Sequence, residues 1–138
     1  MERRSVAGIA VKDGGLFIAR RKPGGDLGGK WEFPGGKAEA GESDRAALTR
    51  EYQEEFGLAI ETGPLLARSS FVHRGVTFCL SAYRVFFNSG EPELCLKEHT
   101  GWRWAAIAEI EQLDFAASDR GLLPGLQAYL TQEAGIQD

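Results

Sequence analysis

Residues 36–58 of the chain read GKAEAGESDRAALTREYQEEFGL and carry its clearest structural pattern. Ser43 is a residue type that caps helix N-termini, and Gly57 suits the left-handed position that follows a helix. Between them an apolar side chain recurs every four residues and makes one stripe: Leu48, Tyr52 and Phe56. The pattern predicts a helix over residues 43–56 that packs this stripe against the rest of the protein.

Three carboxylates share another face of the predicted helix. Glu51, Glu54 and Glu55 stand at positions i, i+3 and i+4, so the helix period brings them together. Side chains this close repel one another, and burial would raise their pKa values. A hard divalent cation relieves the repulsion, because Mg²⁺ prefers oxygen ligands. For these three residues alone, a solvated acidic surface is the alternative interpretation.

The register of the neighbouring residues favours the metal site. The stretch fits the spacing G-x5-E-x7-RE-x-x-EE-x-G, with these fixed positions: Gly36, Glu42, Arg50, Glu51, Glu54, Glu55 and Gly57. Seven specified positions at about 6% each give a chance occurrence on the order of 10⁻⁶ or less per chain. Residues 36–58 therefore resemble the Nudix box of the Nudix hydrolase superfamily. The preceding WEFPGGK (residues 31–37) and the Arg20-Arg21 pair resemble its MutT-like branch.

The resemblance implies the fold class and the architecture of the site. It implies an α/β protein with the Nudix fold, an α/β/α sandwich with a mixed β-sheet and a catalytic loop–helix–loop. We expect one Nudix domain over residues 1–138. Tyr52 departs from the motif, which usually has an aliphatic residue there. Because Tyr52 stays on the apolar stripe, we expect local repacking without loss of function.

The metal ligands follow from the same resemblance. Glu51, Glu54, Glu55 and the carbonyl of Gly35 match positions that bind Mg²⁺, for which Mn²⁺ is the candidate substitute. Glu98 is the candidate for a base or a further ligand from a late loop, with a surface acid as the alternative. Either Glu51 or Glu98 would take the proton from the attacking water, and the sequence leaves this choice open.

The resemblance also implies that Glu42 and Arg50 match positions that support the ligands of the box. Arg50 is placed to pair with Glu54 one turn on and to reach back to Glu42, an orienting role. Lys37 is a candidate catalytic residue that meets charge on the leaving phosphate, with plain loop solvation as the alternative. His99 is expected to be structural or exposed and not catalytic.

Four residues are candidates for binding the substrate. Strand alternation points Arg20 and Arg21 to opposite faces, and the MutT-like resemblance favours Arg21 for a polyphosphate. Phe33 is expected either to stack on a base or to lie in the core. Arg74 would contact the nucleotide from a turn that otherwise faces solvent. Asp119 matches a base-binding position of the MutT-like branch, where it would accept hydrogen bonds from a cytosine, a guanine or an oxidised purine. The alternative is that it caps the terminal helix.

The predicted function is that of a Mg²⁺-dependent nucleoside triphosphate pyrophosphohydrolase. Such an enzyme converts a (d)NTP and water into a (d)NMP and pyrophosphate, here with a role in nucleotide-pool sanitation. One alternative is the same chemistry on a sugar nucleotide, a dinucleotide or an RNA 5′ end. The other is a nucleotide-binding Nudix module without catalysis.

The composition of the chain limits the classes of partner that it is expected to bind. The chain has 138 residues and a net charge of −4, which disfavours duplex nucleic acid as a partner. No apolar run approaches the ~18 residues that span a membrane. Cys79 and Cys95 show no metal spacing, and Cys79 is expected to be a buried free thiol. We expect a cytoplasmic monomer or homodimer that binds a small nucleotide.

The remaining elements follow from short apolar runs and turn residues. We expect strands over residues 4–11, 16–20, 31–33, 65–72, 76–87 and 101–105. We expect short helices over residues 107–113 and 121–132, a glycine-rich loop over 22–30 and a turn over 88–92.

Overall fold

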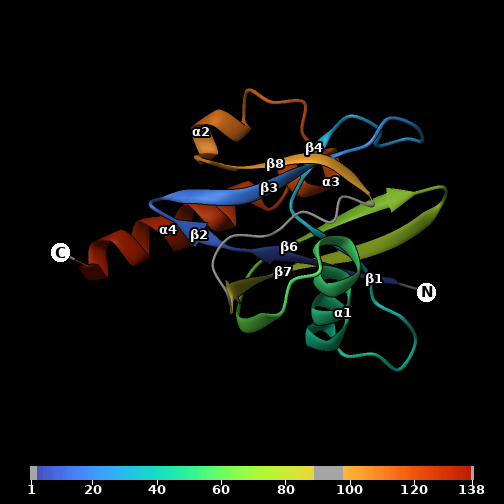
Figure 1. The fold of residues 1–138 in the computed structure, drawn as a ribbon, viewed down its shortest axis with the longest axis horizontal. Coiled ribbons are helices and arrows are strands. Elements are labelled where there is room, and N and C mark those ends of the chain that lie inside the picture. Colours follow the sequence, from blue (N-terminus) through green and yellow to red (C-terminus); the bar gives the residue numbers. More distant parts are fainter. Residues whose placement is uncertain (1–2, 89–97, 138) are drawn as a thin grey trace.

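The strands form two four-stranded sheets in the computed structural model, which describes residues 3–88 and 98–137 (Figure 1). The first sheet has the order β5 (Gly35–Lys37), β1 (Arg3–Ile9), β7 (Val76–Phe87) and β6 (Ile60–His73). This sheet is mixed, because β1 and β7 are parallel and its other pairs are antiparallel. In the second sheet, β3 (Gly15–Arg21) pairs antiparallel with three neighbours: β2 (Val11–Lys12), β4 (Trp31–Glu32) and β8 (His99–Ala105).

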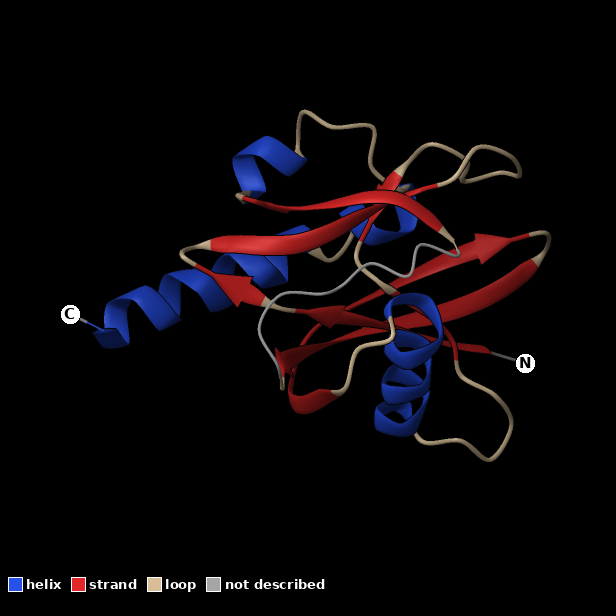
Figure 2. Cartoon of the chain, viewed as in Figure 1, coloured by secondary structure: helices blue, strands red, loops and turns tan. Residues whose placement is uncertain are grey.

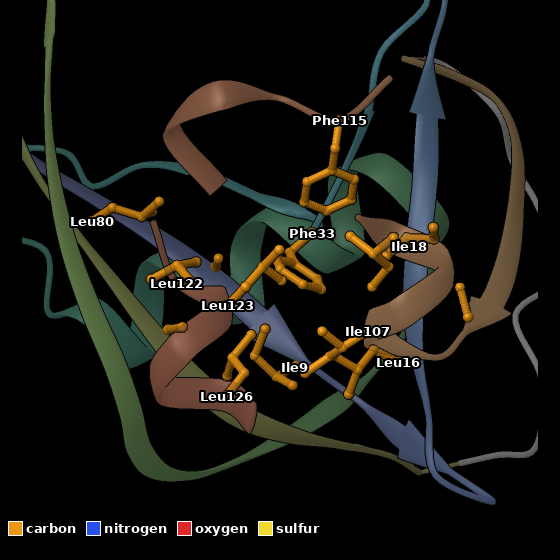
Figure 3. Close-up of a cluster of buried hydrophobic side chains, with 14 residues drawn as sticks. Ile9, Leu16, Ile18, Phe33, Leu80, Ile107, Phe115, Leu122, Leu123 and Leu126 are labelled. Carbon is orange, nitrogen blue, oxygen red and sulfur yellow. The ribbon is translucent and has the colours of Figure 1, made fainter. Parts of the chain in front are cut away.

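The described residues form four helices beside the sheets (Figure 2): α1 (Asp44–Phe56), α2 (Ile107–Ile110), α3 (Ala117–Arg120) and α4 (Leu123–Gln137). Side chains of β3 alternate between two apolar clusters because successive residues of a strand face opposite sides. Leu16 and Ile18 lie in the cluster that α4 covers (Figure 3), whereas Phe17 and Ala19 lie in the cluster that α1 covers. The sheets therefore carry α1 on one face and α4 on the other, which is the predicted layering.

Several element boundaries differ from the prediction. The single strand expected over residues 4–11 is divided at Ala10, where the chain passes from the first sheet to the second. Residues 34–36 were expected to end a strand, yet Gly35–Lys37 forms β5 on the edge of β1. A Cβ on Gly35 would lie 2.0 Å from the Val6 carbonyl oxygen, so glycine is what permits this pairing.

The C-terminal third is also arranged differently. The helix expected over residues 107–113 ends at Ile110, and the one expected over 121–132 is α4, which runs from Leu123 to Gln137. The short helix α3 before it was not predicted. No helix among the described residues is long and apolar enough to cross a membrane. Cys79 is a free thiol that is half-buried, not fully buried as expected. Cys95 and most of the turn expected over 88–92 lie outside the described residues.

Candidate active site

Helix α1 begins and ends as its sequence predicts. The Ser43 hydroxyl accepts a hydrogen bond from the Ala46 backbone N–H at 3.1 Å, and Gly57 takes the left-handed conformation with a φ of 64°. The predicted stripe of Leu48, Tyr52 and Phe56 is buried against the sheets. Burial of that stripe fixes the rotation of the helix and turns its acidic face toward the start of β5.

The acidic face opens into a cavity of about 360 Å³, here called the carboxylate pocket. Its lining comes from four separate parts of the chain: Arg21, Gly35, Gly36, Glu51, Glu54, Glu55 and Glu98. All five residues predicted as metal ligands are among them. Within the described residues, no three of the acidic or histidine side chains lie close enough to form a ready-made metal cluster.

Gly36 admits the Glu51 carboxylate to this pocket. A Cβ on Gly36 would lie 2.6 Å from the carboxylate carbon of Glu51, well inside van der Waals contact. The glycine thus lets the carboxylate lie directly against the backbone of β5. This is a physical reason for glycine at the first position of the motif.

Burial and mutual repulsion shape the acids of the pocket. Glu55 is buried, and its Oε2 has no hydrogen-bond partner among the described residues. Burial, followed by the charges of Glu32 and Glu51, raises the Glu55 pKa to about 9. Burial also raises the pKa of Glu51. A buried carboxylate with an unpartnered oxygen beside other acids suits a hard divalent cation, so the residues present fit such a metal.

Arg50 joins the supporting residues of the box into one network. Its guanidinium donates to Glu42 at 2.8 and 3.0 Å, to Glu51 at 3.0 Å and to Glu54 at 3.3 Å. A further bond reaches the Lys37 carbonyl oxygen at 3.1 Å. The Arg50 hydrogen bond lowers the Glu42 pKa to about 2, so Glu42 stays ionised. The contacts to Glu42 and Glu54 are those that the sequence predicts for Arg50, whereas its orienting role in catalysis stays a prediction.

A second cavity of about 310 Å³ adjoins the first and is here called the aromatic cavity. Phe33, Phe71 and Phe78 lie in its wall, and Lys37 and Asp119 add polar groups. The Lys37 ammonium lies over the Phe78 ring, 5.1 Å from its centroid. The two cavities share three lining residues: Arg21, Gly35 and Gly36. One elongated ligand can therefore occupy both.

Phe33 and Asp119 meet at the inner wall of the aromatic cavity. Phe33 is 2% exposed and packs edge-on against Phe115, with ring centroids 5.1 Å apart, so it belongs to the core as well as to the wall. Asp119 Oδ2 accepts the Phe33 backbone N–H at 2.9 Å. Asp119 lies inside α3, whose N-cap is Ala116, and α4 begins only at Leu123, so the helix-cap alternative is wrong. Burial raises the Asp119 pKa to about 7.

Replacing Asp119 by asparagine is expected to change how stability depends on pH. Because the pKa is raised on folding, the contribution of Asp119 is complete below the unfolded value of 3.8 and is lost as pH rises toward 7. The gain in free energy of unfolding from Asp119→Asn, measured by urea denaturation, should therefore grow between pH 4 and 7 by about 2–4 kcal/mol.

Asp114 offers a matched control in the same part of the chain. It is exposed, and its hydrogen bond to Lys30 lowers its pKa. Asp114→Asn should therefore show a pH trend of opposite sign, with stability lost relative to the wild type above pH 4. A pH-independent effect of Asp119→Asn would contradict the assignment of a buried, destabilised carboxylate.

The structure does not bring Arg74 to the site. Its side chain is 79% exposed at the tip of the β6–β7 hairpin, where it pairs with Asp26 at 3.4 Å. Its neighbour His73 lines the aromatic cavity instead. The Phe71 and Phe78 side chains, which stack across β6 and β7 at 5.1 Å, also belong to the cavity and were not predicted. The sequence showed alternating apolar positions in these two strands. It did not show which face of the strands would line a cavity.

Glu32 and His99 form the other unpredicted part of the site. His99 is fully buried, and its Nε2 lies 2.8 Å from Glu32 Oε2. The same oxygen accepts a hydrogen bond from Arg21 Nη1 at 3.4 Å. The sequence placed Glu32 in a short strand and gave no sign that it belongs to the site. The pairing of that strand with β3 brings Glu32 next to His99 and Arg21.

Comparison with known proteins defines the class of this protein. The NUDIX domain matches residues 1–126, and the chain belongs to the NUDIX family. The predicted Nudix fold and the predicted hydrolysis of phosphoric anhydride bonds are confirmed at this level.

Particular relatives cover nearly the whole chain. A Mycobacterium tuberculosis protein named "Putative 8-oxo-dGTP diphosphatase 2" is 37% identical over 130 residues, which cover 94% of this chain and 91% of that one. The CTP pyrophosphohydrolase of Escherichia coli is 35% identical over 129 residues, covering 94% and 92%. The solution structure of the E. coli ORF135 protein superimposes with a TM-score of 0.81 at 34% identity, over 92% of this chain and 89% of that one. These likenesses support the MutT-like branch.

Proposed function

We propose that this protein is a Mg²⁺-dependent nucleoside triphosphate pyrophosphohydrolase that yields a nucleoside monophosphate and pyrophosphate. One observation carries the proposal: the carboxylate pocket and the aromatic cavity meet at Arg21, Gly35 and Gly36. A nucleotide has a matching division into a charged polyphosphate and a flat, partly apolar base. The phosphates would lie against the carboxylate pocket, and the nucleoside would lie in the aromatic cavity.

The substrate class rests on the relatives as well as on the site. The two relatives named above carry the names of a CTP pyrophosphohydrolase and an 8-oxo-dGTP diphosphatase. Cytosine and oxidised guanine both offer hydrogen-bond donors, and Asp119 is buried in the wall of the aromatic cavity. We propose these two kinds of nucleotide as substrates and nucleotide-pool sanitation in the cytoplasm as the role.

The metal would be held by carboxylates of the pocket. Glu51, Glu54 and Glu55, with the Gly35 carbonyl oxygen and Glu98, supply oxygen ligands of the kind Mg²⁺ or Mn²⁺ takes. When bound, such a cation withdraws charge from phosphate oxygens and favours deprotonation of water. Arg50 holds Glu51 and Glu54 from outside the pocket and so limits the positions that these two ligands can take.

The chain's own residues would place and neutralise the substrate. Arg21 lies where the two cavities join, so its guanidinium can bind a phosphate while the nucleoside fills the aromatic cavity. Lys37 adds a second positive charge on the side of the aromatic cavity. Glu51 or Glu98 would accept the proton of the attacking water, and both line the carboxylate pocket.

Product analysis on a nucleotide panel tests this function. Purified protein with Mg²⁺ should release pyrophosphate, and no orthophosphate, from CTP, dCTP or 8-oxo-dGTP, with lower kcat/KM for dATP and UDP-glucose. EDTA should abolish turnover, and Mn²⁺ should restore it. Glu54→Gln should reduce kcat by about a hundredfold, because it removes one charged oxygen ligand.

Three outcomes would contradict the proposal. Turnover that persists in EDTA, or that is unchanged by Glu54→Gln, would exclude the metal site described above. Preferential cleavage of UDP-glucose into two monophosphates would move the substrate class to sugar nucleotides. Size-exclusion chromatography during purification tests the predicted monomer or homodimer.

A further inference from the structure

A buried carboxylate and a buried imidazole lie under the junction of the two cavities. Glu32 Oε2 lies 2.8 Å from His99 Nε2 and 3.4 Å from Arg21 Nη1. The Glu32 side chain is 10% exposed, that of His99 0%, and that of Arg21 33%. An ionised carboxylate only accepts hydrogen bonds, so the imidazole Nε2–H donates to it. One oxygen thus holds an imidazole on its inner side and a guanidinium that reaches toward solvent.

Three strands bring these side chains together. Glu32 in β4 lies opposite Ala19 of β3, and His99 in β8 lies opposite Arg21 on the other edge of β3. The β3–β8 register shifts between Arg20 and Arg21, so the ladder is irregular at the residue that reaches the cavities. Sheet geometry alone therefore does not fix the direction of the Arg21 side chain.

Helix α1 holds the His99 imidazole from its other side. The Phe56 ring at the end of α1 stacks on His99, with centroids 5.1 Å apart and planes inclined by 16°. His99 is therefore held by ring stacking and by its bond to Glu32, while its Nδ1 has no partner among the described residues. A rigid imidazole at this position limits the conformations of the Glu32 side chain, and Glu32 in turn limits those of the Arg21 side chain.

We propose that His99 is a positioning residue for hydrolysis: through Glu32, it holds the Arg21 guanidinium at the junction of the carboxylate pocket and the aromatic cavity. The inference rests on the proposed function, because it assigns Arg21 to the substrate phosphates. An arginine side chain has many rotamers, and a phosphate site needs the one that spans both cavities. His99 itself lines neither cavity among the described residues, so the role proposed for it acts through Glu32 and Arg21.

The strand that carries His99 also carries Glu98. The Glu98 carbonyl oxygen accepts the Lys22 backbone N–H at 3.1 Å, which extends the β3–β8 ladder to the edge of the carboxylate pocket. The contacts of His99 with Glu32 and Phe56 therefore also hold the start of β8, where Glu98 lines the carboxylate pocket. The backbone bond to Lys22 and the contacts of His99 both hold Glu98 in place.

Two substitutions separate positioning from packing. His99→Phe keeps a flat ring against Phe56 and removes the donor to Glu32, whereas His99→Gln keeps a donor near the Nε2 position and removes the ring. We expect His99→Phe to raise the KM for CTP about tenfold with kcat changed less than about threefold, since one hydrogen bond to a charged group is lost. His99→Gln should retain a KM within about threefold of the wild-type value.

A double-mutant cycle tests whether His99→Phe raises KM by way of Arg21. In the Arg21→Ala background, His99→Phe should cause no further rise in KM, because the group that it positions is gone. Trp104→Phe, another large aromatic change in β8 that does not contact Glu32, is the matched control and should leave KM unchanged. Additive effects of His99→Phe and Arg21→Ala, or a larger loss in His99→Gln than in His99→Phe, would overturn the inference.

A spectroscopic readout separates this inference from the proposed function. The Arg21 side-chain Nε–H resonance, assigned by its absence in Arg21→Lys, should show an ordered heteronuclear NOE in the wild type and in His99→Gln. In His99→Phe it should become mobile. If the protein hydrolyses no nucleotide yet this pattern holds, the proposed function fails and the positioning stands. If turnover is as proposed but Arg21 is equally ordered in all variants, only the positioning fails.

Discussion

Glu55→Gln is expected to lower kcat for nucleotide hydrolysis by about a hundredfold or more. Its carboxylate is buried in the carboxylate pocket with one oxygen unpartnered among the described residues, and a metal there would depend on its charge. The amide has nearly the same shape but no negative charge. Steady-state kinetics with Mg²⁺ and CTP, with pyrophosphate release as the readout, measures the loss.

The same substitution should stabilise the protein when metal is absent. Burial raises the Glu55 pKa to about 9, so its contribution to stability is complete below the unfolded value of 4.5 and is lost as pH rises toward 9. At pH 7 in EDTA, Glu55→Gln should therefore unfold with a free energy about 2 kcal/mol above that of the wild type. Mg²⁺ should raise the Tm of the wild type and leave that of the variant unchanged.

Glu61→Gln is the charge-matched control, because Glu61 is exposed in β6 and outside both cavities. It should change neither kcat nor the effect of Mg²⁺ on the Tm. A Glu55→Gln variant that is fully active, or one that is less stable than the wild type in EDTA, would contradict the assignment of Glu55 as a buried metal ligand.

Gly8→Ala is expected to destabilise the fold by about 3 kcal/mol, measured by urea denaturation. A Cβ on Gly8 would lie 2.4 Å from the Tyr52 hydroxyl oxygen and 2.6 Å from Cε1 of the same ring. Tyr52 is fully buried between α1 and the sheets, next to Phe56 and Phe87, so its ring has little room to move. Overlap between β1 and α1 would disturb the helix that carries the pocket.

Tyr52→Leu should partly rescue this variant. Leucine restores the usual aliphatic character of the position and withdraws the atoms that overlap with the added Cβ. Tyr52→Leu alone should be destabilising because it leaves a cavity over Gly8, so the two effects should be strongly non-additive. Tyr52→Phe should not rescue Gly8→Ala, since Cε1 remains. Additive free energies in the double variant would show that Gly8 and Tyr52 are not coupled.

The expected repacking around Tyr52 thus has a definite form in the structure. The tyrosine hydroxyl has no hydrogen-bond partner in the described part of the chain, and a glycine in β1 makes space for the ring. From the sequence, Gly8 was one of many glycines near the N-terminus. Only the packing of α1 on β1 identifies it as the partner of Tyr52, because the two residues are distant in the chain.

Predictions for the active site succeeded where they depended on local geometry. The Arg50 contacts to Glu42 and Glu54 follow from one or two helical turns and a short loop, and the structure has them. The Arg74 prediction depended on where a hairpin tip ends relative to a cavity. That position is set by the length and twist of β6 and β7, and it leaves Arg74 in solvent.

The sequence alone determined the helix of residues 43–56, its apolar stripe and its three-carboxylate face, because caps and the 3.6-residue period are local properties. It also indicated the family, since the motif lies within one continuous segment. Tertiary structure decided the pairing of Gly35–Lys37 with β1, the joining of two cavities at Arg21, and the burial of Glu32 against His99. Those features depend on which strands become neighbours, and strand pairing links residues that no local pattern connects.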